Sequence, residues 1–297
     1  MRVKAIIITG GEGFISANFI KLFLSKNKSL HIISIDSYLN NYPRKIDSPR
    51  IKYLKGETKN IDKILTNLSK RYDINCLFHF GEFSRIVASF QYFNECLESN
   101  VIGTNKVIRF CIEKKIRIIY SASSSKFGNK GRDENLSPYS WTKSKNIELI
   151  KNASKWFGLK YTIVYFFNVF GPGQIQNGKM ASVIGIFERQ YLENKPLTVV
   201  GKGELKRDFT HVEDICNGIY LAWKKKIQDD FLLGTGKNHK IIDIARRYKT
   251  EIIYIKNRPG ERLKSAPIDK KAFNLLGYYP KKDILKYIDE FIKKNGS

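Results

Sequence analysis

The stretch "KAIIITGGEGFISANFIKLFLSK", residues 4–26, decides the fold. An apolar, β-branched block runs into three closely spaced glycines and then into an amphipathic pattern, which predicts a strand, a tight turn and a helix. The glycines at 10, 11 and 13 let the chain turn sharply and let a pyrophosphate approach the backbone. The helix that follows would offer free N–H groups and the positive end of its dipole to the same anion. The segment therefore predicts a nucleotide-binding strand, turn and helix.

An acidic residue stands where such a unit needs one. Asp36 ends the next apolar block, "HIISID" at 31–36, about 20 residues beyond the glycine turn, where a carboxylate can accept a hydrogen bond from a ribose 2′-hydroxyl. Ser37 and Tyr38 follow it, so no basic residue stands ready for a 2′-phosphate. The pattern favours NAD(H) over NADP(H). The competing interpretation is an ordinary tight turn near an unrelated aspartate, since Ser16 replaces the usual third glycine.

The first two thirds of the chain repeat this alternation of strand and helix. Short apolar blocks separated by amphipathic stretches indicate a parallel sheet with helices on both faces. We therefore predict an α/β fold with a doubly wound, parallel-sheet Rossmann domain. The further strands expected are "IKYLKG" (51–56), "CLFHF" (76–80), "IRIIYS" (116–121) and "YTIVYF" (161–166), and the longer helices expected are 101–115 and 140–157.

The alternation of strand and helix patterns ends after Phe170, where the Gly-rich segment "GPGQIQNGKM" begins. A helix near 181–193 and a short strand, "LTVV" at 197–200, indicate a smaller C-terminal α+β lobe. We expect an NAD-binding Rossmann domain and a substrate-binding lobe. The first would comprise residues 1–168 with 208–233 returning to it, and the second residues 169–207 and 234–297.

The composition of the 297-residue chain excludes several classes of protein. Hydrophobic residues make up 42% of it, too many for a disordered chain, and no apolar run reaches the ~18 residues needed to span a membrane. We expect a soluble, cytoplasmic protein. The four dispersed cysteines show no CxxC and no metal-ligand spacing, which predicts reduced core thiols and no metal site.

The charge is the one extreme feature of the composition. The 53 Lys and Arg residues against 28 Asp and Glu give a formal net charge of +25. The basic residues are spread from Lys4 to Lys294 and do not gather in one stripe, which favours a compositional bias over a nucleic-acid surface. Nucleic-acid binding stays a remote alternative, and no nucleic-acid partner is expected. In either case, a positive field should attract phosphorylated small molecules.

The segment "SPYSWTKSK" at 137–145 carries a candidate general base. Pro138 suits the first turn of a helix, so Tyr139 and Lys143 would lie one helical turn apart on the same face. A tyrosine is a poor base at neutral pH, but a neighbouring ammonium can stabilise its phenolate. Such a pair could take a proton from a sugar-type hydroxyl. "YSASSSKFG" at 120–128 ends a predicted strand and would bring hydroxyl groups to the same crevice.

Taken together, these motifs resemble one family, the extended short-chain dehydrogenase/reductases, and within it the NAD-dependent nucleotide-sugar epimerases and dehydratases. The resemblance covers nearly the whole chain. The segments that match, in order, are "TGGEGFIS" (9–16), "FHFGEFSRIVAS" (78–89), "SNVIGT" (99–104), "SPYSWTKSKNIE" (137–148), "YFFNVFGPGQ" (165–174), "KPLTVVGKGELKRDFTHVEDI" (195–215) and "RPGERLKSAPIDKKAFNLLGYYP" (258–280). The resemblance implies bound NAD, a nucleotide-diphosphate sugar as substrate, and a homodimer formed through helices that include 101–115 and 140–157.

The resemblance also assigns roles to individual residues. Ser123 would hydrogen-bond the reacting C4 oxygen, Tyr139 would be the base, and Lys143 would bind the nicotinamide ribose and stabilise the phenolate. The coenzyme-binding positions implied are Gly10, Gly13, Phe14, Ile15, Asp36, Glu57, Thr58, Phe80, Gly81 and Lys143. The substrate-binding positions implied are Glu82, Arg85, Ser124, Asn168, Arg207 and Arg258.

Some of these positions have simpler explanations or depart from the family. Asn168, Arg207 and Arg258 match positions that hold the substrate diphosphate, but the asparagine could cap a turn and the arginines could be solvated surface charges. Glu82 stands where the family usually has alanine. We interpret it as an inward carboxylate paired with Arg85, and the alternative is a role in specificity or as a second acid–base group.

The residues after Ser123 favour one reaction within the family. Dehydratases resembling this chain follow the catalytic hydroxyl with an Asp–Glu pair, and glucuronate-type decarboxylases have a Glu at the second position, whereas Ser124 and Ser125 stand here. A 4,6-dehydratase and a decarboxylase are therefore disfavoured. We predict a C4-epimerase, with a C4 dehydrogenase or 4-keto-sugar reductase as the alternative. The resemblance also implies that a residue near Ala266 limits the size of the sugar pocket, and a small side chain there would admit an N-acetylhexosamine or another bulky sugar.

Overall fold

The computed structural model describes residues 2–38, 44–66, 68, 71–131, 133–260 and 269–296. The opening segment forms β1 (Val3–Thr9), α1 (Phe14–Lys26) and β2 (His31–Asp36), as its pattern predicts. The apolar block of β1 is continuous because both faces of the strand are covered. Ile6 and Ile8 belong to one buried cluster, whereas Ile7 belongs to another on the opposite face of the sheet.

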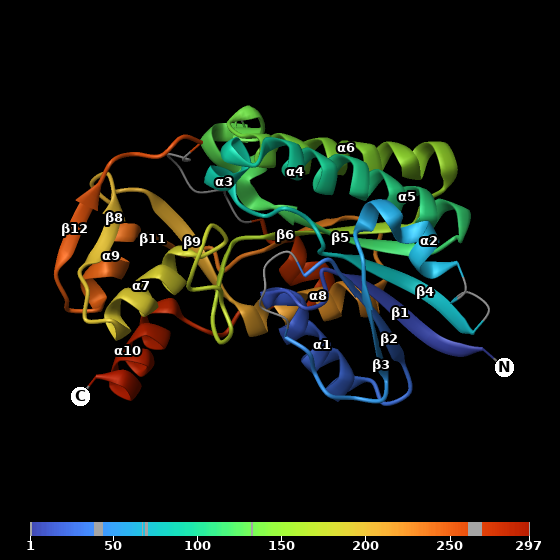
Figure 1. Ribbon diagram of the computed structural model, residues 1–297, viewed down its shortest axis with the longest axis horizontal. Coiled ribbons are helices and arrows are strands. Elements are labelled where there is room, and N and C mark those ends of the chain that lie inside the picture. The colour runs from blue at the N-terminus through green and yellow to red at the C-terminus, as the bar shows by residue number, and fades with distance from the viewer. Residues whose placement is uncertain are drawn as a thin grey trace.

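A parallel sheet of seven strands forms the centre of the molecule (Figure 1). Its order is β10-β6-β5-β4-β1-β2-β3, and every neighbouring pair is parallel. The order reverses between β1 and β4, which confirms the doubly wound prediction and places the ligand crevice of such folds at the carboxyl ends of these strands. The other strands are β3 (Ile51–Lys55), β4 (Tyr72–His79), β5 (Arg117–Ser123), β6 (Tyr161–Phe166) and β10 (Asp230–Leu233).

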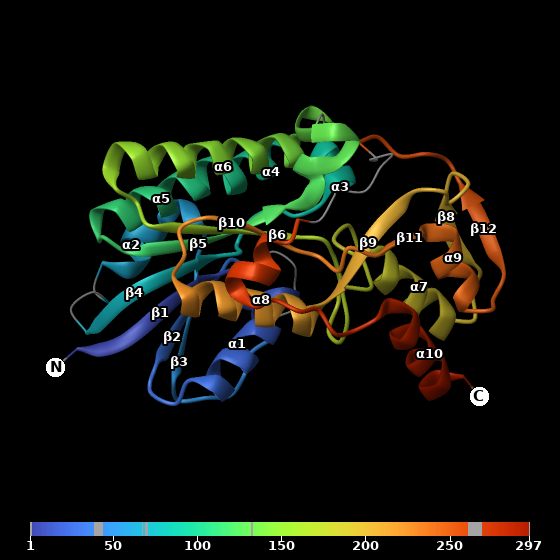
Figure 2. The ribbon, with the colours of Figure 1, turned by 180° about the vertical axis from the view of Figure 1, so that it is seen from behind.

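Helices cover both faces of this sheet. One face carries α5 and α6 with the shorter helices near them, and the other carries α1 and α8, as the two opposite views show (Figures 1 and 2). Ile147 and Ile150 on α6 pack in the first cluster, and Phe19 and Phe23 on α1 pack in the second. The helices are α2 (Ile61–Leu65), α3 (Ile86–Gln91), α4 (Phe93–Leu97), α5 (Thr104–Glu113), α6 (Pro138–Phe157) and α8 (Val212–Lys225), with the π-helix η2 (Glu98–Gly103) and the 3-10 helices η1 (Thr58–Asn60), η3 (Ser124–Gly131) and η4 (Asp133–Asn135).

The remaining elements gather at one end of the sheet around a third buried cluster that includes Phe187, Phe209 and Tyr248 (Figure 1). The strands among them form a three-stranded sheet, in the order β11-β9-β7, and a parallel pair, β12-β8. The division into two lobes by residue range stays a prediction. The elements at this end are β7 (Asn168–Phe170), α7 (Val183–Leu192), β8 (Leu197–Val200), β9 (Lys206–His211), β11 (Asn238–Lys240), α9 (Ile241–Arg247), β12 (Ile252–Ile255) and α10 (Ile284–Asn295). The π-helix η5 (Ala272–Leu276) instead packs against α8 in the second cluster.

Two predictions from composition can be compared with the structure. All four cysteines are buried and free, which confirms the prediction of core thiols. Within the described ranges, no helix combines the length and the apolar character that a membrane span requires.

Candidate active site

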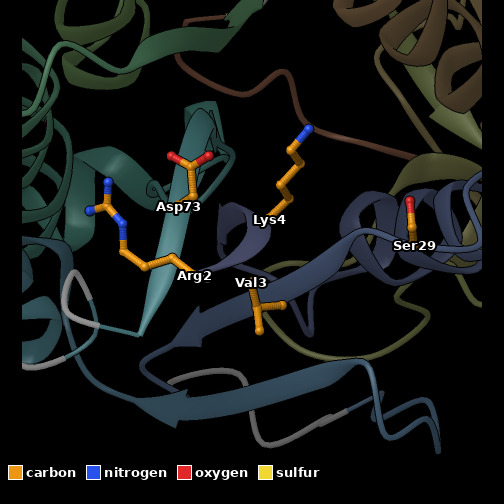
Figure 3. Close-up of a pocket in the computed structure, with 5 residues that line it drawn as sticks. All are labelled: Arg2, Val3, Lys4, Ser29 and Asp73. Atoms are coloured by element: carbon orange, nitrogen blue, oxygen red, sulfur yellow. The ribbon is translucent and has the colours of Figure 1, made fainter.

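A pocket at the amino ends of β1 and β4 does not belong to the predicted site. Its lining residues are Arg2, Val3, Lys4, Ser29 and Asp73 (Figure 3). The glycine turn follows Thr9 at the opposite end of β1, so this pocket and the turn lie at opposite edges of the sheet. The candidate site is therefore built from the residues at the carboxyl edge.

The glycine turn depends on a close contact between two backbone segments. Gly10 has a φ of +65°, and a Cβ atom added to it would lie 2.7 Å from the Cα atom of Gly81. A Cβ on Gly81 would in turn lie 2.7 Å from the backbone nitrogen of Gly10. Neither position can hold a larger residue without movement of the backbone. The two glycines therefore allow the turn after β1 to contact the end of β4 closely.

The start of α1 is the part of the turn at which the sequence predicts an anion. Gly13 is the N-cap residue and provides no side-chain cap, and the first turn, which begins with Phe14 and Ile15, contains no acidic residue. The first N–H groups of a helix lack partners within the helix, so this terminus suits an anion such as a pyrophosphate. Ser16, which replaces the usual third glycine, is buried.

Asp36 is held at the edge of the same turn. One carboxylate oxygen accepts a hydrogen bond from the backbone N–H of Glu12 at 3.0 Å, and the other accepts from that of Tyr38 at 2.9 Å. The Tyr38 hydroxyl donates to Glu12, whose burial raises the pKa of its carboxyl group. The second Glu12 oxygen, Oε2, is buried without a partner in the described part of the chain. Sequence reasoning missed Glu12, although it stands inside the glycine motif.

The other predicted coenzyme positions lie on separate segments near this edge. Glu57 forms a 2.7 Å ion pair with Lys59, and Thr58 packs its hydroxyl group against Gly103 of η2. Phe80 follows β4, and its ring centroid lies 6.1 Å from that of Phe166. No contact here tests whether these three residues bind a dinucleotide, and they stay predictions.

The three predicted catalytic residues come from β5 and from the first turns of α6. Ser123 ends β5, and its hydroxyl accepts a hydrogen bond from the backbone N–H of Ser125 at 3.2 Å. Tyr139 is the second residue of α6 and is half-buried. Its backbone N–H donates to the hydroxyl of Ser89 on α3 at 3.2 Å. Lys143 lies one turn further on and is buried, and its Nζ donates to the carbonyl oxygen of Ser121 at 2.6 Å.

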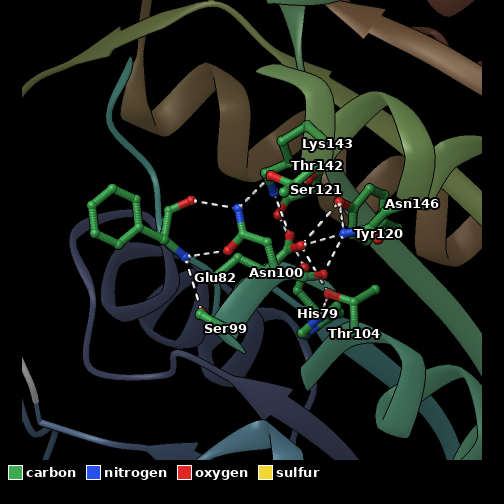
Figure 4. Close-up of polar contacts among 12 residues, drawn as sticks. His79, Glu82, Ser99, Asn100, Thr104, Tyr120, Ser121, Thr142, Lys143 and Asn146 are labelled. Carbon is green, nitrogen blue, oxygen red and sulfur yellow. Dashed lines mark hydrogen bonds and ion pairs between the residues drawn. The ribbon is translucent and has the colours of Figure 1, made fainter. Parts of the chain in front are cut away.

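The predicted pairing of Glu82 with Arg85 is wrong. Glu82 forms its ion pair with Lys143 (Figure 4), whereas the guanidinium of Arg85 donates to the carbonyl oxygens of Met180 at 2.9 Å and Ser84 at 3.0 Å. The two residues are three apart, but α3 begins only at Ile86 and Arg85 is extended at its N-cap. Helical spacing therefore does not apply to them, and the Glu82 side chain turns toward α6.

Three further side chains donate hydrogen bonds to Glu82 Oε1 (Figure 4). The donors are the Thr104 hydroxyl at 2.8 Å, the Tyr120 hydroxyl at 3.1 Å and the Asn146 amide at 2.9 Å. They come from α5, β5 and α6, so the carboxylate joins three elements that are far apart in the sequence. Sequence reasoning missed all three donors, although each lies in a segment that the sequence singles out: Thr104 in "SNVIGT", Tyr120 in "YSASSSKFG" and Asn146 in "SPYSWTKSKNIE".

His79 extends this network to the glycine turn. Its Nε2 lies 2.9 Å from the Thr104 hydroxyl, and its Nδ1 lies 2.7 Å from that of Thr9. Thr104 uses its single proton to reach the acceptor-only carboxylate, so it must accept from His79 Nε2–H, and His79 Nδ1 must accept from Thr9. Burial lowers the pKa of His79 to about 4, so the imidazole is neutral at pH 7. The Thr9 hydroxyl also accepts from the backbone N–H of Gly81 at 3.1 Å.

The predicted substrate residues lie on several segments. Asn168 on β7 donates to the carbonyl oxygen of Asp208 at 2.8 Å, and Arg207 lies largely buried on the paired strand β9. Ser124 is buried next to Ser123, whereas Arg258 is exposed beyond β12. The assignment of these residues to a substrate stays a prediction, and Ala266 lies outside the described residues.

Comparison with known proteins identifies the family. Residues 6–234, more than half of the chain, match the model of the NAD dependent epimerase/dehydratase family. The chain belongs to this family. NAD is its coenzyme, and the glycine contact, the uncapped start of α1 and the Asp36 carboxylate fit that molecule.

Other members of the epimerase/dehydratase family are similar over most of their length. A UDP-glucose epimerase named YtcB from Bacillus subtilis, which is uncharacterized, is 30% identical over 72% of this chain and 71% of its own. An ADP-L-glycero-D-manno-heptose-6-epimerase from Brachyspira hyodysenteriae is 29% identical over 93% of this chain and 87% of its own. The crystal structure of UDP-glucuronic acid 4-epimerase from Bacillus cereus, in complex with UDP-glucuronic acid and NAD, matches with a TM-score of 0.86 at 25% identity, over 98% and 99% of the two chains.

Proposed function

We propose that this protein is an NAD-dependent nucleotide-sugar 4-epimerase. The observation that carries the proposal is the set of groups at the carboxyl end of β5. Ser123 lies there, Lys143 from α6 bonds to the same strand, and buried serines, not acids, follow Ser123. A dehydration needs a further acid and base beside the sugar, and Ser124 and Ser125 supply neither at neutral pH.

The roles of the chain's own residues follow from their chemistry. NAD supplies a nicotinamide that can take the C4 hydride and return it to the opposite face of the sugar. Tyr139 would take the proton of the C4 hydroxyl and give it back, and Ser123 would hydrogen-bond the C4 oxygen. Lys143 would reach the nicotinamide ribose. Two of its donors already go to Glu82 and Ser121 within the described part of the chain, which leaves one N–H for the ribose.

The substrate class in this proposal is a nucleotide-diphosphate sugar. Asn168 and Arg207 lie on the paired strands β7 and β9, and Arg85 and Arg258 add cations on other segments. Guanidinium groups suit a diphosphate because they bind its oxygens in pairs. The net charge of +25 would also favour encounter with an anionic substrate.

The test is incubation of the purified protein with UDP-, dTDP-, GDP- and CDP-hexoses, with products read by NMR. Inversion at C4 alone, without accumulation of NADH, supports the proposal. Stoichiometric NADH with a 4-keto product would instead favour the alternative, a C4 dehydrogenase or 4-keto-sugar reductase. The buried carboxylate beside Lys143 motivates that alternative, because a charge close to the nicotinamide affects its readiness to accept hydride.

The role of Tyr139 has its own test. Tyr139→Phe should reduce turnover about 10²- to 10⁴-fold, the usual contribution of a general base, while coenzyme binding persists. Tyr254→Phe, on the exposed strand β12, is the matched control and should leave turnover unchanged. Turnover of Tyr139→Phe within about tenfold of the unmodified protein would remove Tyr139 from the role of base.

We also propose a homodimer. Phe93 on α4, Ile102 on η2 and Trp141 on α6 are large, exposed apolar residues on elements that contact one another. Such a group of apolar side chains is typical of a protein interface. Ile102→Glu should convert a dimer to a monomer in analytical ultracentrifugation, whereas Leu192→Glu, at an exposed apolar position on α7, should not. A monomeric unmodified protein would contradict the proposal.

A further inference from the structure

Glu12 lies inside the glycine turn and is joined to Asp36, the residue expected to hold the adenosine ribose of the coenzyme. Its backbone N–H donates to Asp36 Oδ2 at 3.0 Å, and its carboxylate accepts a hydrogen bond from the Tyr38 hydroxyl. The backbone N–H of Tyr38 donates to the other Asp36 oxygen at 2.9 Å. One tyrosine therefore links the two acidic residues at the end of β2, where folds of this kind hold the ribose.

The backbone of Tyr38 adopts an unusual conformation in this link. Its φ of +59° lies in the left-handed region, which a bulky residue rarely occupies. Outliers of this kind cost energy and cluster at ligand-binding and active sites. In this conformation the Tyr38 side chain meets Glu12, which is buried. The arrangement therefore points to a role for Glu12 in binding and not only in folding.

A lysine lies beside the same tyrosine. The Lys45 ammonium is 5.4 Å from the centre of the Tyr38 ring and 5.5 Å from that of the Tyr53 ring on β3, and both distances suit a cation–π contact. Lys45 is exposed, and no acidic side chain within the described ranges forms an ion pair with it. Sequence reasoning considered only the residues directly after Asp36 and missed Lys45, which the fold brings back to Tyr38.

Two charges of opposite sign act on Glu12. Burial raises the pKa of its carboxyl group, the hydrogen bond from Tyr38 and the charge of Lys45 lower it, and the charge of Asp36 raises it. Burial also raises the pKa of Tyr38 and that of Tyr53, so both phenols keep their protons at neutral pH. When Glu12 is ionised, this cluster therefore contains two carboxylates and one ammonium.

We propose that Glu12 is a specificity-determining residue whose charge offsets that of Lys45, so that this cation does not hold a 2′-phosphate and NAD is bound in preference to NADP. Asp36 is expected to favour NAD by itself, through a hydrogen bond to the ribose. Glu12 adds a second effect, which acts through its charge and needs no contact with the coenzyme. The inference concerns the choice of coenzyme and does not rest on the proposed reaction at the sugar.

The test is the ratio of the dissociation constants of NADP and NAD, measured by isothermal titration calorimetry on the coenzyme-free protein at pH 8. At this pH the 2′-phosphate is fully ionised and the ionised form of Glu12 is favoured. Glu12→Gln keeps the size of the side chain and removes its charge, so the ratio should fall about tenfold. NAD should still bind more tightly than NADP, because Asp36 remains.

The double variant Glu12→Gln with Lys45→Met tests the part played by the lysine. In Glu12→Gln the ammonium can attract the 2′-phosphate, so its removal should return the ratio to within about twofold of that of the unmodified protein. Lys45→Met alone should raise the ratio, because it leaves the Glu12 carboxylate without an opposing charge. Glu12→Ala should lower the ratio as Glu12→Gln does, and it covers the case in which Glu12→Gln does not fold.

Glu113→Gln on α5 is the control for net charge. Glu113 pairs with Arg109 on the surface, and the exposed fraction of its side chain is 52%. Its replacement removes the same charge at a distance from the glycine turn and should leave the ratio unchanged. An unchanged ratio in both Glu12 variants would overturn the proposal, and so would a ratio that stays low after Lys45→Met is added.

The outcome is independent of the proposed function. No sugar enters these titrations, so a protein without 4-epimerase activity can still show the predicted ratios. In that case Glu12 selects the coenzyme and the assigned reaction fails. Conversely, C4 inversion by the unmodified protein together with an unchanged ratio in the Glu12 variants would preserve the reaction and remove this role of Glu12.

Discussion

The glycine turn and the Glu82 network adjoin each other but are built in different ways. The turn brings two backbone segments into contact at Gly10 and Gly81, and the network joins side chains from β4, β5, α5 and α6. The first is specified by a short run of sequence, and the second only by the completed fold. The stability of the glycine turn should therefore fall when a larger side chain is introduced, whereas the stability of the network should fall when a charged group is removed.

The largest effect on stability is expected from removal of charge in the network. Glu82→Ala leaves the Lys143 ammonium buried without its partner, which should lower the free energy of unfolding by about 3–5 kcal/mol. Chemical denaturation measures the change. Glu148→Ala is the matched control, because Glu148 pairs with Lys145 on the exposed face of the same helix, with exposed fractions of 60% and 52%. If Glu82→Ala lowered the free energy of unfolding as little as Glu148→Ala, the buried pair would not contribute to stability as predicted.

His79 should make the stability of the network depend on pH. Its pKa is about 4 in the folded protein and near 6.5 when exposed, so the unfolded chain binds a proton that the folded protein does not between these values. Its contribution to stability is complete above pH 6.5 and is lost as the pH falls toward 4, by up to about 3 kcal/mol.

The measurement is the free energy of unfolding from pH 7 to pH 4. His79→Gln should lose part of its stability at pH 7 through altered hydrogen bonds, yet its curve should fall less steeply on acidification than that of the unmodified protein. His31→Gln, at the start of β2, serves as the control and should keep the steeper curve. Parallel curves for all three proteins would show that His79 does not titrate as its burial requires.

The sequence was sufficient to predict the parts of the site that depend on local backbone geometry. Gly10, Gly13 and Asp36 lie where their spacing places them, because a turn and a strand end are short-range features. The pairing of Glu82 was predicted wrongly, because the partner Lys143 is 61 residues away and reaches it only when α6 packs on the sheet. His79 lies in the family-like segment 78–89, but its role was not predicted, because its two hydroxyl partners come from β1 and α5.

A smaller effect is expected at the backbone contact. Gly81→Ala places a Cβ atom 2.7 Å from the backbone nitrogen of Gly10, and the movement it forces should cost about 1–3 kcal/mol of unfolding free energy and weaken NAD binding. Gly158→Ala is the control, because Gly158 has a φ of +69° but nothing within 4 Å of an added Cβ, so it reports backbone strain alone. Differential scanning fluorimetry with and without NAD separates the loss of stability from the loss of NAD binding. NAD should stabilise Gly158→Ala as much as the unmodified protein, and Gly81→Ala less.

The smallest effect on the free energy of unfolding is expected at Ser125, where the backbone makes a hydrogen bond and the side chain does not. Its hydroxyl is buried without a partner in the described part of the chain, whereas its backbone N–H bonds to the Ser123 hydroxyl. Ser125→Ala removes a buried, unpaired polar group and keeps the backbone hydrogen bond, so the free energy of unfolding should change by less than about 0.5 kcal/mol or rise. Ser123→Ala removes the acceptor and should lower turnover, although the fold remains. If Ser125→Ala lost as much turnover as Ser123→Ala, the Ser125 hydroxyl would act on the substrate. Ser125 would then contribute through its side chain and not only through its backbone.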